Sequence, residues 1–124
     1  MLEPRPRLTL VEDDAFLLGA LSFALEAEGY RVFGFTSAAE TLARIEATDC
    51  LVIDFRLPDM DGLTLIARLR EQGLREPAIL ITPNLDERCR HKAGLADVDI
   101  VEKPLLTAEL GRRIEARLAG WTAR

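Results

Sequence analysis

The sequence predicts an α/β fold in which five β-strands alternate with five α-helices around a parallel sheet. Short apolar runs rich in β-branched residues recur along the 124-residue chain, and most segments between them carry apolar residues at helical spacing. No internal repeat, Ser/Gly linker or low-complexity tract divides the chain, so one domain is expected. This alternation requires right-handed crossovers, which place helices on both faces of the sheet.

The strands are expected at five short runs whose hydrophobicity is continuous rather than alternating. Such runs are typical of strands that are buried on both faces. The first four are bounded by polar or turn residues, and the fifth is the weakest. The runs lie at residues 8–11, 30–35, 51–53, 79–81 and 100–101.

Four of the helices are expected from capping residues and from the spacing of leucine and isoleucine. The first follows Asp14 and stops at Gly29, a residue suited to a helix C-terminus. Ser37 and Glu40 have the spacing of a capping box and open the second helix. Thr107 is expected to cap the last helix. The apolar faces of the first, third and last helices carry Leu17, Leu21, Leu25, Leu65, Ile66, Leu69, Leu110, Ile114 and Leu118.

The composition disfavours several functional classes. Hydrophobic residues make up 48% and charged residues 30% of the chain, as in ordinary globular domains. The formal net charge of −5 repels phosphate backbones and disfavours direct nucleic-acid binding. No apolar run approaches the roughly 20 residues of a membrane-spanning helix, and the N-terminus lacks the apolar centre of a signal peptide. We therefore expect a cytoplasmic protein without a membrane partner.

The histidine and cysteine content argues against two further kinds of site. His91 is the single histidine, and Cys50 and Cys89 form neither a CxxC pair nor a metal spacing with it. A histidine-based catalytic triad or a zinc site is therefore not expected. Both cysteines are expected to be reduced packing residues.

Polar residues follow four of the predicted strands at the point where each strand ends. Residues 12–14 read Glu-Asp-Asp, Asp54 follows the third strand, Thr82 the fourth, and residues 102–104 read Glu-Lys-Pro after the fifth. In an open parallel sheet these ends share one edge, where ligands bind. Clustered carboxylates repel one another unless a cation neutralises them, and hard oxygen ligands favour Mg²⁺. The pattern indicates a magnesium site beside a lysine suited to a phosphoryl group.

Each of these residues also has an ordinary structural explanation. Asp13 and Asp14 can cap the first helix, Asp54 can open a turn toward Pro58, and Lys103 can lie solvated in a loop. Their joint occurrence, in this order and at successive strand ends of one sheet, favours a functional site.

With these residues in view, the sequence resembles the receiver domain of two-component response regulators over residues 8–118. The resemblance is carried by Asp13-Asp14, by the run DFRLPDMDG at residues 54–62, by Thr82, and by Lys103-Pro104. The separations from residue 14 to 54, 54 to 82 and 82 to 103 are 40, 28 and 21 residues. The resemblance implies a flavodoxin-like (βα)5 fold, doubly wound, with strand order 2-1-3-4-5. We expect a single receiver domain over residues 1–124, with a core at about 7–119 and no output domain in this chain, either as a complete single-domain regulator or as a receiver cut from a longer protein.

The resemblance implies that Asp54 is the phosphoacceptor, which receives a phosphoryl group from a histidine kinase or a histidine phosphotransfer protein. Lys103 would pair with a phosphoryl oxygen, and the hydroxyl of Thr82 would bond the phosphoryl group and report its presence. Pairing with the kinase would be set by the first helix and nearby loops. A homodimer or an output contact would use the face of the fourth helix, fifth strand and fifth helix.

The resemblance also implies the metal ligands. Asp14 and Asp54 would ligate Mg²⁺, Asp13 would act partly through water, and the backbone carbonyl of Arg56 would complete the protein's share. Phosphoryl transfer depends mostly on alignment and charge neutralisation, and a carboxylate is already ionised at pH 7. The chain therefore needs no general base, and it would promote only its own phosphorylation and dephosphorylation rather than act as an enzyme.

The loop after the third strand is expected to be held in a fixed shape. Gly62 after Asp61 suits a tight turn, and Pro58 stiffens the segment.

Three features depart from the receiver pattern. Pro83 follows Thr82 and lacks the backbone N–H that would help to hold a phosphoryl group. Ile100 stands three residues before Lys103, where receivers commonly have a rotating aromatic ring. Residues 86–93 are almost entirely polar for a fourth helix, and Gly94 comes early before a long stretch over 95–99, so this helix is expected to be short or displaced. We expect an intact acidic site with an atypical switch.

Two other readings stay open at this point. A pseudo-receiver that binds proteins without phosphorylation is favoured by Pro83 and Ile100 and disfavoured by the intact acidic residues and lysine. A haloacid-dehalogenase-like phosphatase also begins from an aspartyl nucleophile, but it requires a second Asp where this chain has Arg56.

Overall fold

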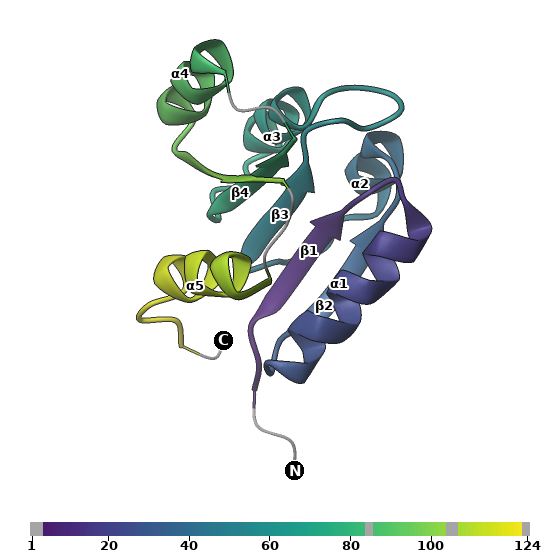
Figure 1. Cartoon of the computed structure of the whole chain (residues 1–124), viewed down its shortest axis with the longest axis vertical. Helices are drawn as coiled ribbons and strands as arrows, with labels where there is room; N and C mark the ends of the chain where they lie inside the picture. Colours follow the sequence, from purple (N-terminus) through teal and green to yellow (C-terminus); the bar gives the residue numbers. More distant parts are fainter. Residues whose placement is uncertain (1–3, 84–85, 104–106, 123–124) are drawn as a thin grey trace.

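The computed structural model describes residues 4–83, 86–103 and 107–122. Within this part of the chain, strands and helices alternate strictly (Figure 1). The strands are β1 (Arg7–Val11), β2 (Arg31–Phe35), β3 (Cys50–Asp54), β4 (Ala78–Thr82) and β5 (Val98–Glu102). The helices are α1 (Ala15–Ala27), α2 (Ala38–Arg44), α3 (Gly62–Glu71), α4 (Glu87–Leu95) and α5 (Thr107–Arg117).

The five strands form one parallel sheet in the order β2-β1-β3-β4-β5. Side chains of α1 and α5 pack on one face of the sheet, and those of α2, α3 and α4 pack on the other. Figure 1 shows this three-layer arrangement, with α1 and α5 in front of the sheet. The predicted doubly wound, flavodoxin-like fold is confirmed, including its strand order.

The centre of the sheet is buried as its continuous hydrophobicity predicts. Every residue of β3 and β4 is buried, because helices cover both faces at these two strands. The edge strand β2 differs, since none of its five residues is fully buried. The expectation that this strand is buried on both faces is therefore wrong. Its neighbour Tyr30 is buried but precedes the strand.

Local capping sets where the helices begin and end. The carboxylate of Asp14 caps α1, and Gly29 ends that helix with a φ of 104°, a left-handed conformation that favours glycine. Ser37 Oγ accepts the Glu40 N–H at 3.1 Å, as the capping box predicts. The Glu40 carboxylate reaches back to the N–H of Thr36 at 3.1 Å. The side chain of Thr107 lies outside the described residues, so its capping role stays a prediction.

The region after β4 is more regular than expected. Gly94 does not end α4, which continues to Leu95, and β5 begins at Val98. Asp97 closes the short connection with a φ of 55°, a conformation that Asp tolerates better than most residues. The expected long stretch over residues 95–99 is therefore wrong. Cys89 and Ala93, the expected apolar residues of this helix, are both buried.

Within the described residues, no helix is long and apolar enough to span a membrane.

Candidate functional site

The polar residues that follow the strands meet at the carboxyl edge of the sheet, as expected. Asp54 is the last residue of β3 and is 4% exposed, and Thr82 is the last residue of β4 and is 1% exposed. Glu12 follows β1 directly and Lys103 follows β5 directly. The backbone N–H of Lys103 donates to the carbonyl of Thr82 at 2.8 Å, which fixes the start of the lysine loop against the end of β4.

Three carboxylates gather beside the end of β3. Glu12, Asp13 and Asp54 each offer one oxygen, and these oxygens all lie within 4.8 Å of one another. Asp14 is not part of this group. Its Oδ1 accepts the N–H of Phe16 at 3.0 Å and the N–H of Leu17 at 3.2 Å.

The structure thus places the side chains of these acids differently from the expected pair Asp13 and Asp14, and which of them bind a metal stays a prediction. Glu12 lies with Asp13 and Asp54, whereas Asp14 has the structural role of a helix cap that was its alternative explanation. The sequence contained a signal for this assignment. An Asp directly before an apolar helix is a favoured N-cap, which leaves the two preceding acids for the site.

The charge on this cluster is only partly compensated by protein groups. Lys103 Nζ lies 3.4 Å from Asp54 Oδ1 and 3.7 Å from Glu12 Oε1. Burial raises the pKa of Glu12 to about 7, and its hydrogen bond with Asp13 and the charge of Asp54 act in the same direction. The N–H of Asp14, which donates to Glu12 Oε2 at 3.2 Å, opposes this rise. One ammonium therefore faces three carboxylates.

The donor set fits a divalent cation with a preference for oxygen. Asp54 Oδ1 is buried and forms no hydrogen bond among the described residues, although the Lys103 ammonium lies 3.4 Å from it, so this oxygen can accept a further cation or a phosphoryl group. Carboxylate oxygens without thiolate or imidazole are the ligands that Mg²⁺ prefers. Glu12, Asp13 and Asp54 are the residues that would hold it.

The loop between β3 and α3 fixes the backbone around Asp54. The N–H of Phe55 donates to the carbonyl of Ile81 at 2.8 Å, and the N–H of Gly62 donates to the carbonyl of Phe55 at 2.7 Å. Gly62 is the first residue of α3 and does not adopt a positive φ, so no left-handed conformation requires glycine at this position. Its importance is steric, because a Cβ there would lie 2.5 Å from the carbonyl oxygen of Asp54.

A second contact, not foreseen from the sequence, holds the same loop. The Asp59 carboxylate accepts the N–H groups of Ala38 at 3.0 Å and Ala39 at 2.7 Å, at the start of α2. The bond from Ala39 is the main cause of the lowered pKa of Asp59. The run at residues 54–62 contains this Asp, but its partner is distant in sequence.

The remaining expected residues occupy less constrained positions. Arg56 is exposed and forms an isolated antiparallel bridge with Asp61. Pro83 is exposed directly after Thr82, and Ile100 is half-buried against the cluster that lies on the side of α3. The roles of the Arg56 carbonyl and of the Thr82 hydroxyl stay predictions.

A doubly wound domain with carboxylates and a lysine at the carboxyl edge of its sheet has the architecture of a receiver-type signalling domain. The sequence matches the response regulator receiver domain over residues 8–115, and the chain belongs to this family. Receiver domains interact with histidine kinases or phosphotransfer proteins, and they bind Mg²⁺ at an acidic pocket. This chain has an acidic cluster of Glu12, Asp13 and Asp54.

Known proteins support this assignment. The chain is 37% identical over 119 residues to the phosphate regulon transcriptional regulatory protein PhoB of Rhizobium meliloti (strain 1021), covering 91% of this chain and 52% of that protein. A CheY-like response regulator receiver domain protein from Methanospirillum hungatei JF-1 superposes with a TM-score of 0.87 at 27% identity, over 94% of this chain and 96% of that one. Response regulator DrrB of Thermotoga maritima gives 0.85 at 26% identity, over 97% and 55%. The chain thus spans about half the length of the curated relatives it matches.

Proposed function

We propose that this chain is the phosphoacceptor of a two-component phosphorelay, with Asp54 as the residue that is phosphorylated. The observation that supports this most directly is the environment of Asp54. Its Oδ1 is buried without a hydrogen bond, two further carboxylates lie within 4.8 Å, and Lys103 Nζ lies 3.4 Å away. The receiver unit in this proposal is the core over residues 7–119.

The transfer step follows from the charges of these groups. An ionised oxygen of Asp54 attacks the phosphorus of a phosphohistidine donor, a P–O bond forms, and the P–N bond breaks with its electron pair leaving on the imidazole nitrogen. No proton has to be removed from Asp54, so a general base is unnecessary. Lys103 neutralises charge on a phosphoryl oxygen. Bound Mg²⁺ would supply further neutralisation of the phosphoryl oxygens, held by Glu12, Asp13, Asp54 and the Arg56 carbonyl.

The switch in this proposal is atypical at two positions. Thr82 would bond the phosphoryl group through its hydroxyl, but Pro83 contributes no backbone N–H beside it. A charge-assisted hydrogen bond of that kind is worth roughly 1.5–3 kcal/mol. Ile100, half-buried against the cluster near α3, has no ring to rotate inward. Coupling between Asp54 and the face of α4, β5 and α5 therefore works without the usual aromatic movement.

The surface of α1 supports docking of a phosphodonor protein at this helix. Phe16 is 88% exposed and Phe23 is 78% exposed, and they lie seven residues apart, so both are on one side of the helix. The residues between them on that side, Gly19 and Ala20, are small and exposed. An uncharged helical surface of this kind suits packing against another apolar helix.

Phosphorylation by acetyl phosphate and Mg²⁺, followed by intact mass spectrometry, tests the proposal. The chain should gain the mass of one phosphoryl group, and Asp54→Asn should gain none. Asp14→Asn is the matched control, because Asp14 caps α1 and lies outside the acidic cluster, and it should still be phosphorylated. The pseudo-receiver reading, which the absent N–H at Pro83 favours, predicts no gain of mass in any of the three proteins.

A further inference from the structure

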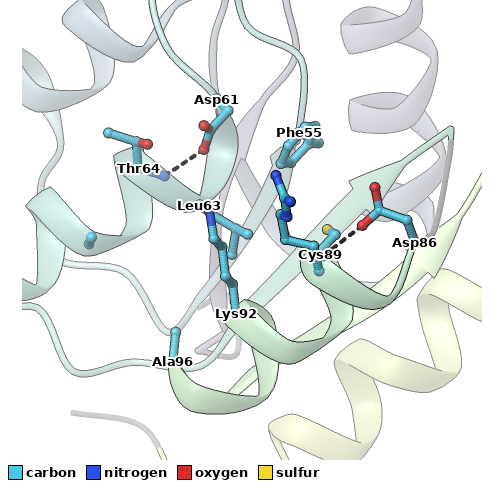
Figure 2. A pocket seen from close by; sticks show the side chains of 10 residues that line it. Phe55, Asp61, Leu63, Thr64, Asp86, Cys89, Lys92 and Ala96 are labelled. Carbon is cyan, nitrogen blue, oxygen red and sulfur yellow. Dashed lines mark hydrogen bonds between the residues drawn. The ribbon is translucent and has the colours of Figure 1, made fainter.

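A cavity of about 340 Å³ lies between α3 and α4, on the α3 side of the sheet. Figure 2 shows it between Leu63 and Thr64 of α3 on one side and Cys89 and Lys92 of α4 on the other. The acidic cluster of Glu12, Asp13 and Asp54 does not line it. Its volume is at the lower end of the range of roughly 300–1,000 Å³ that is common for small-molecule sites.

The cavity exists because the helices that face each other carry short side chains. Ala67 of α3 and Cys89 and Ala96 at α4 line it, and none of them is large enough to fill the gap. Phe55 and Leu63 supply the larger apolar surfaces of the wall. In Figure 1, α4 lies at the edge of the domain, and its buried residues Cys89 and Ala93 belong to the core cluster on the α3 side of the sheet. The result is an apolar space with open access.

The charged residues around this space are not equivalent. Asp61 accepts the N–H of Thr64 at 2.8 Å and Asp86 accepts the N–H of Cys89 at 2.7 Å, so each of these two carboxylates lies at a helix N-terminus, where the helix dipole offsets part of its negative charge. Arg88 and Lys92 also line the cavity, and neither forms a salt bridge within the described part of the chain.

The two cations are placed to act together. They are four residues apart on α4 and therefore lie on the same side of the helix. In Figure 2, Lys92 extends from α4 toward Leu63 across the mouth of the cavity. Two cations beside an apolar wall complement a ligand that has an apolar body and a negative group.

We propose that the cavity between α3 and α4 binds a small organic anion with a flat apolar body, of the class of aryl carboxylates and aryl sulfonates. The body packs against Phe55, Leu63 and Cys89, and the anionic group pairs with Arg88 and Lys92. Inorganic phosphate lacks the apolar body that the wall requires. A peptide helix needs a long groove, whereas this space is a single cavity of limited volume. Glu12, Asp13 and Asp54 do not line the cavity, so binding there does not require the acidic cluster.

Two probes with similar rings distinguish the parts of this proposal. The anionic 8-anilinonaphthalene-1-sulfonate should bind the chain in a saturable 1:1 complex, measured by fluorescence. The neutral N-phenyl-1-naphthylamine should bind about tenfold more weakly or less. Amide shifts in ¹H–¹⁵N spectra should be confined to α3, α4 and Phe55. Shifts centred on the exposed phenylalanines of α1, or equal affinity for both probes, would overturn the proposal.

Matched variants locate the site. Arg88→Gln and Lys92→Gln should each weaken binding of the sulfonate by about fivefold to tenfold. Arg90→Gln removes the same charge from the same helix but at a position that does not line the cavity, so it should change the affinity less than about twofold. Ala67→Phe, at an exposed position that lines the cavity, should fill the space and abolish binding. Equal effects of the three charge variants would show only nonspecific attraction and would contradict the proposal. Asp54→Asn should bind as the unmodified chain does, so this result is independent of the phosphoacceptor proposal.

Discussion

Replacing Gly62 by alanine should destabilise the protein and displace its phosphoacceptor. The added Cβ would lie 2.5 Å from the carbonyl oxygen of Asp54, 2.8 Å from a methyl group of Leu80 and 3.0 Å from one of Ile53. The first of these neighbours is backbone and cannot rotate away. Overpacking in a well-packed core costs about 1–3 kcal/mol, and alanine at a helical position returns at most about 1 kcal/mol. The expected net loss is about 1–2 kcal/mol.

Urea unfolding gives the stability, and phosphorylation by acetyl phosphate reports the position of Asp54. Gly94→Ala is the matched control, because Gly94 lies within α4 and a Cβ there meets no atom within 4 Å. This control should gain about 0.5–1 kcal/mol and keep its phosphorylation rate. If Gly62→Ala were as stable as the unmodified protein and reacted at the same rate, the steric argument would be refuted.

Three further predictions concern the acidic cluster, the α5 contact and the α1 surface. The pKa of Glu12 is raised to about 7 from 4.5, so the metal-free folded state binds a proton more tightly than the unfolded state. Its free energy of unfolding should fall as pH rises from about 4.5 to 7, by up to roughly 3 kcal/mol, and urea titrations of Glu12→Gln should lack this slope. Asp99→Asn should cost about 1–2 kcal/mol at pH 7, because two bonds of 2.8 Å from Arg117 are weakened or lost. Since the hydrogen bond from Arg117 lowers the pKa of Asp99, this contribution is present above the unfolded pKa and is lost as pH falls through the folded value; unfolding midpoints of the variant and the unmodified protein should converge in acid. Phe16→Ala combined with Phe23→Ala should slow transfer from a phosphohistidine donor protein by tenfold or more, about 1.4 kcal/mol or more, and leave the rate with acetyl phosphate unchanged; equal losses with both donors would contradict a docking role.

The fold could be predicted because each element carries its own signal. The apolar runs that became β3 and β4 are buried on both faces, and the spacing of leucines in α1 and α3 matches their buried residues. The predictions were wrong where the position of a segment in the fold, rather than its own sequence, decides its burial or its length. The run that became β2 is apolar, yet its place at the sheet edge leaves it open. Gly94 is a residue type that commonly ends helices, but here α4 continues through it to Leu95. The neighbouring Ala93 is buried in the core, and this packing holds the last turn of the helix in place.

The site was predictable in its composition and less so in its geometry. The sequence predicts that Asp54, Asp13 and Lys103 lie at one edge of the sheet. It does not show which two of the three consecutive acids at residues 12–14 face the site, because that depends on which of them caps α1. The folded structure is needed to show that the side chain of Glu12 lies in the cluster and that the side chain of Asp14 caps the helix. The hydrogen bonds from Ala38 and Ala39 of α2 to the Asp59 carboxylate depend on a loop conformation that the spacing of residues alone does not specify.

The peptide bond to Lys103 has a mechanical consequence. Its N–H is bound to the carbonyl of Thr82, so the last peptide of β4 and the first residue after β5 form one joined unit. A force on the hydroxyl of Thr82 and a force on the ammonium of Lys103 would therefore both act on the hydrogen bond between the Lys103 N–H and the Thr82 carbonyl. A displacement of either side chain is therefore transmitted to both β4 and β5. The end of one strand cannot move far unless the end of the other moves with it or this hydrogen bond breaks.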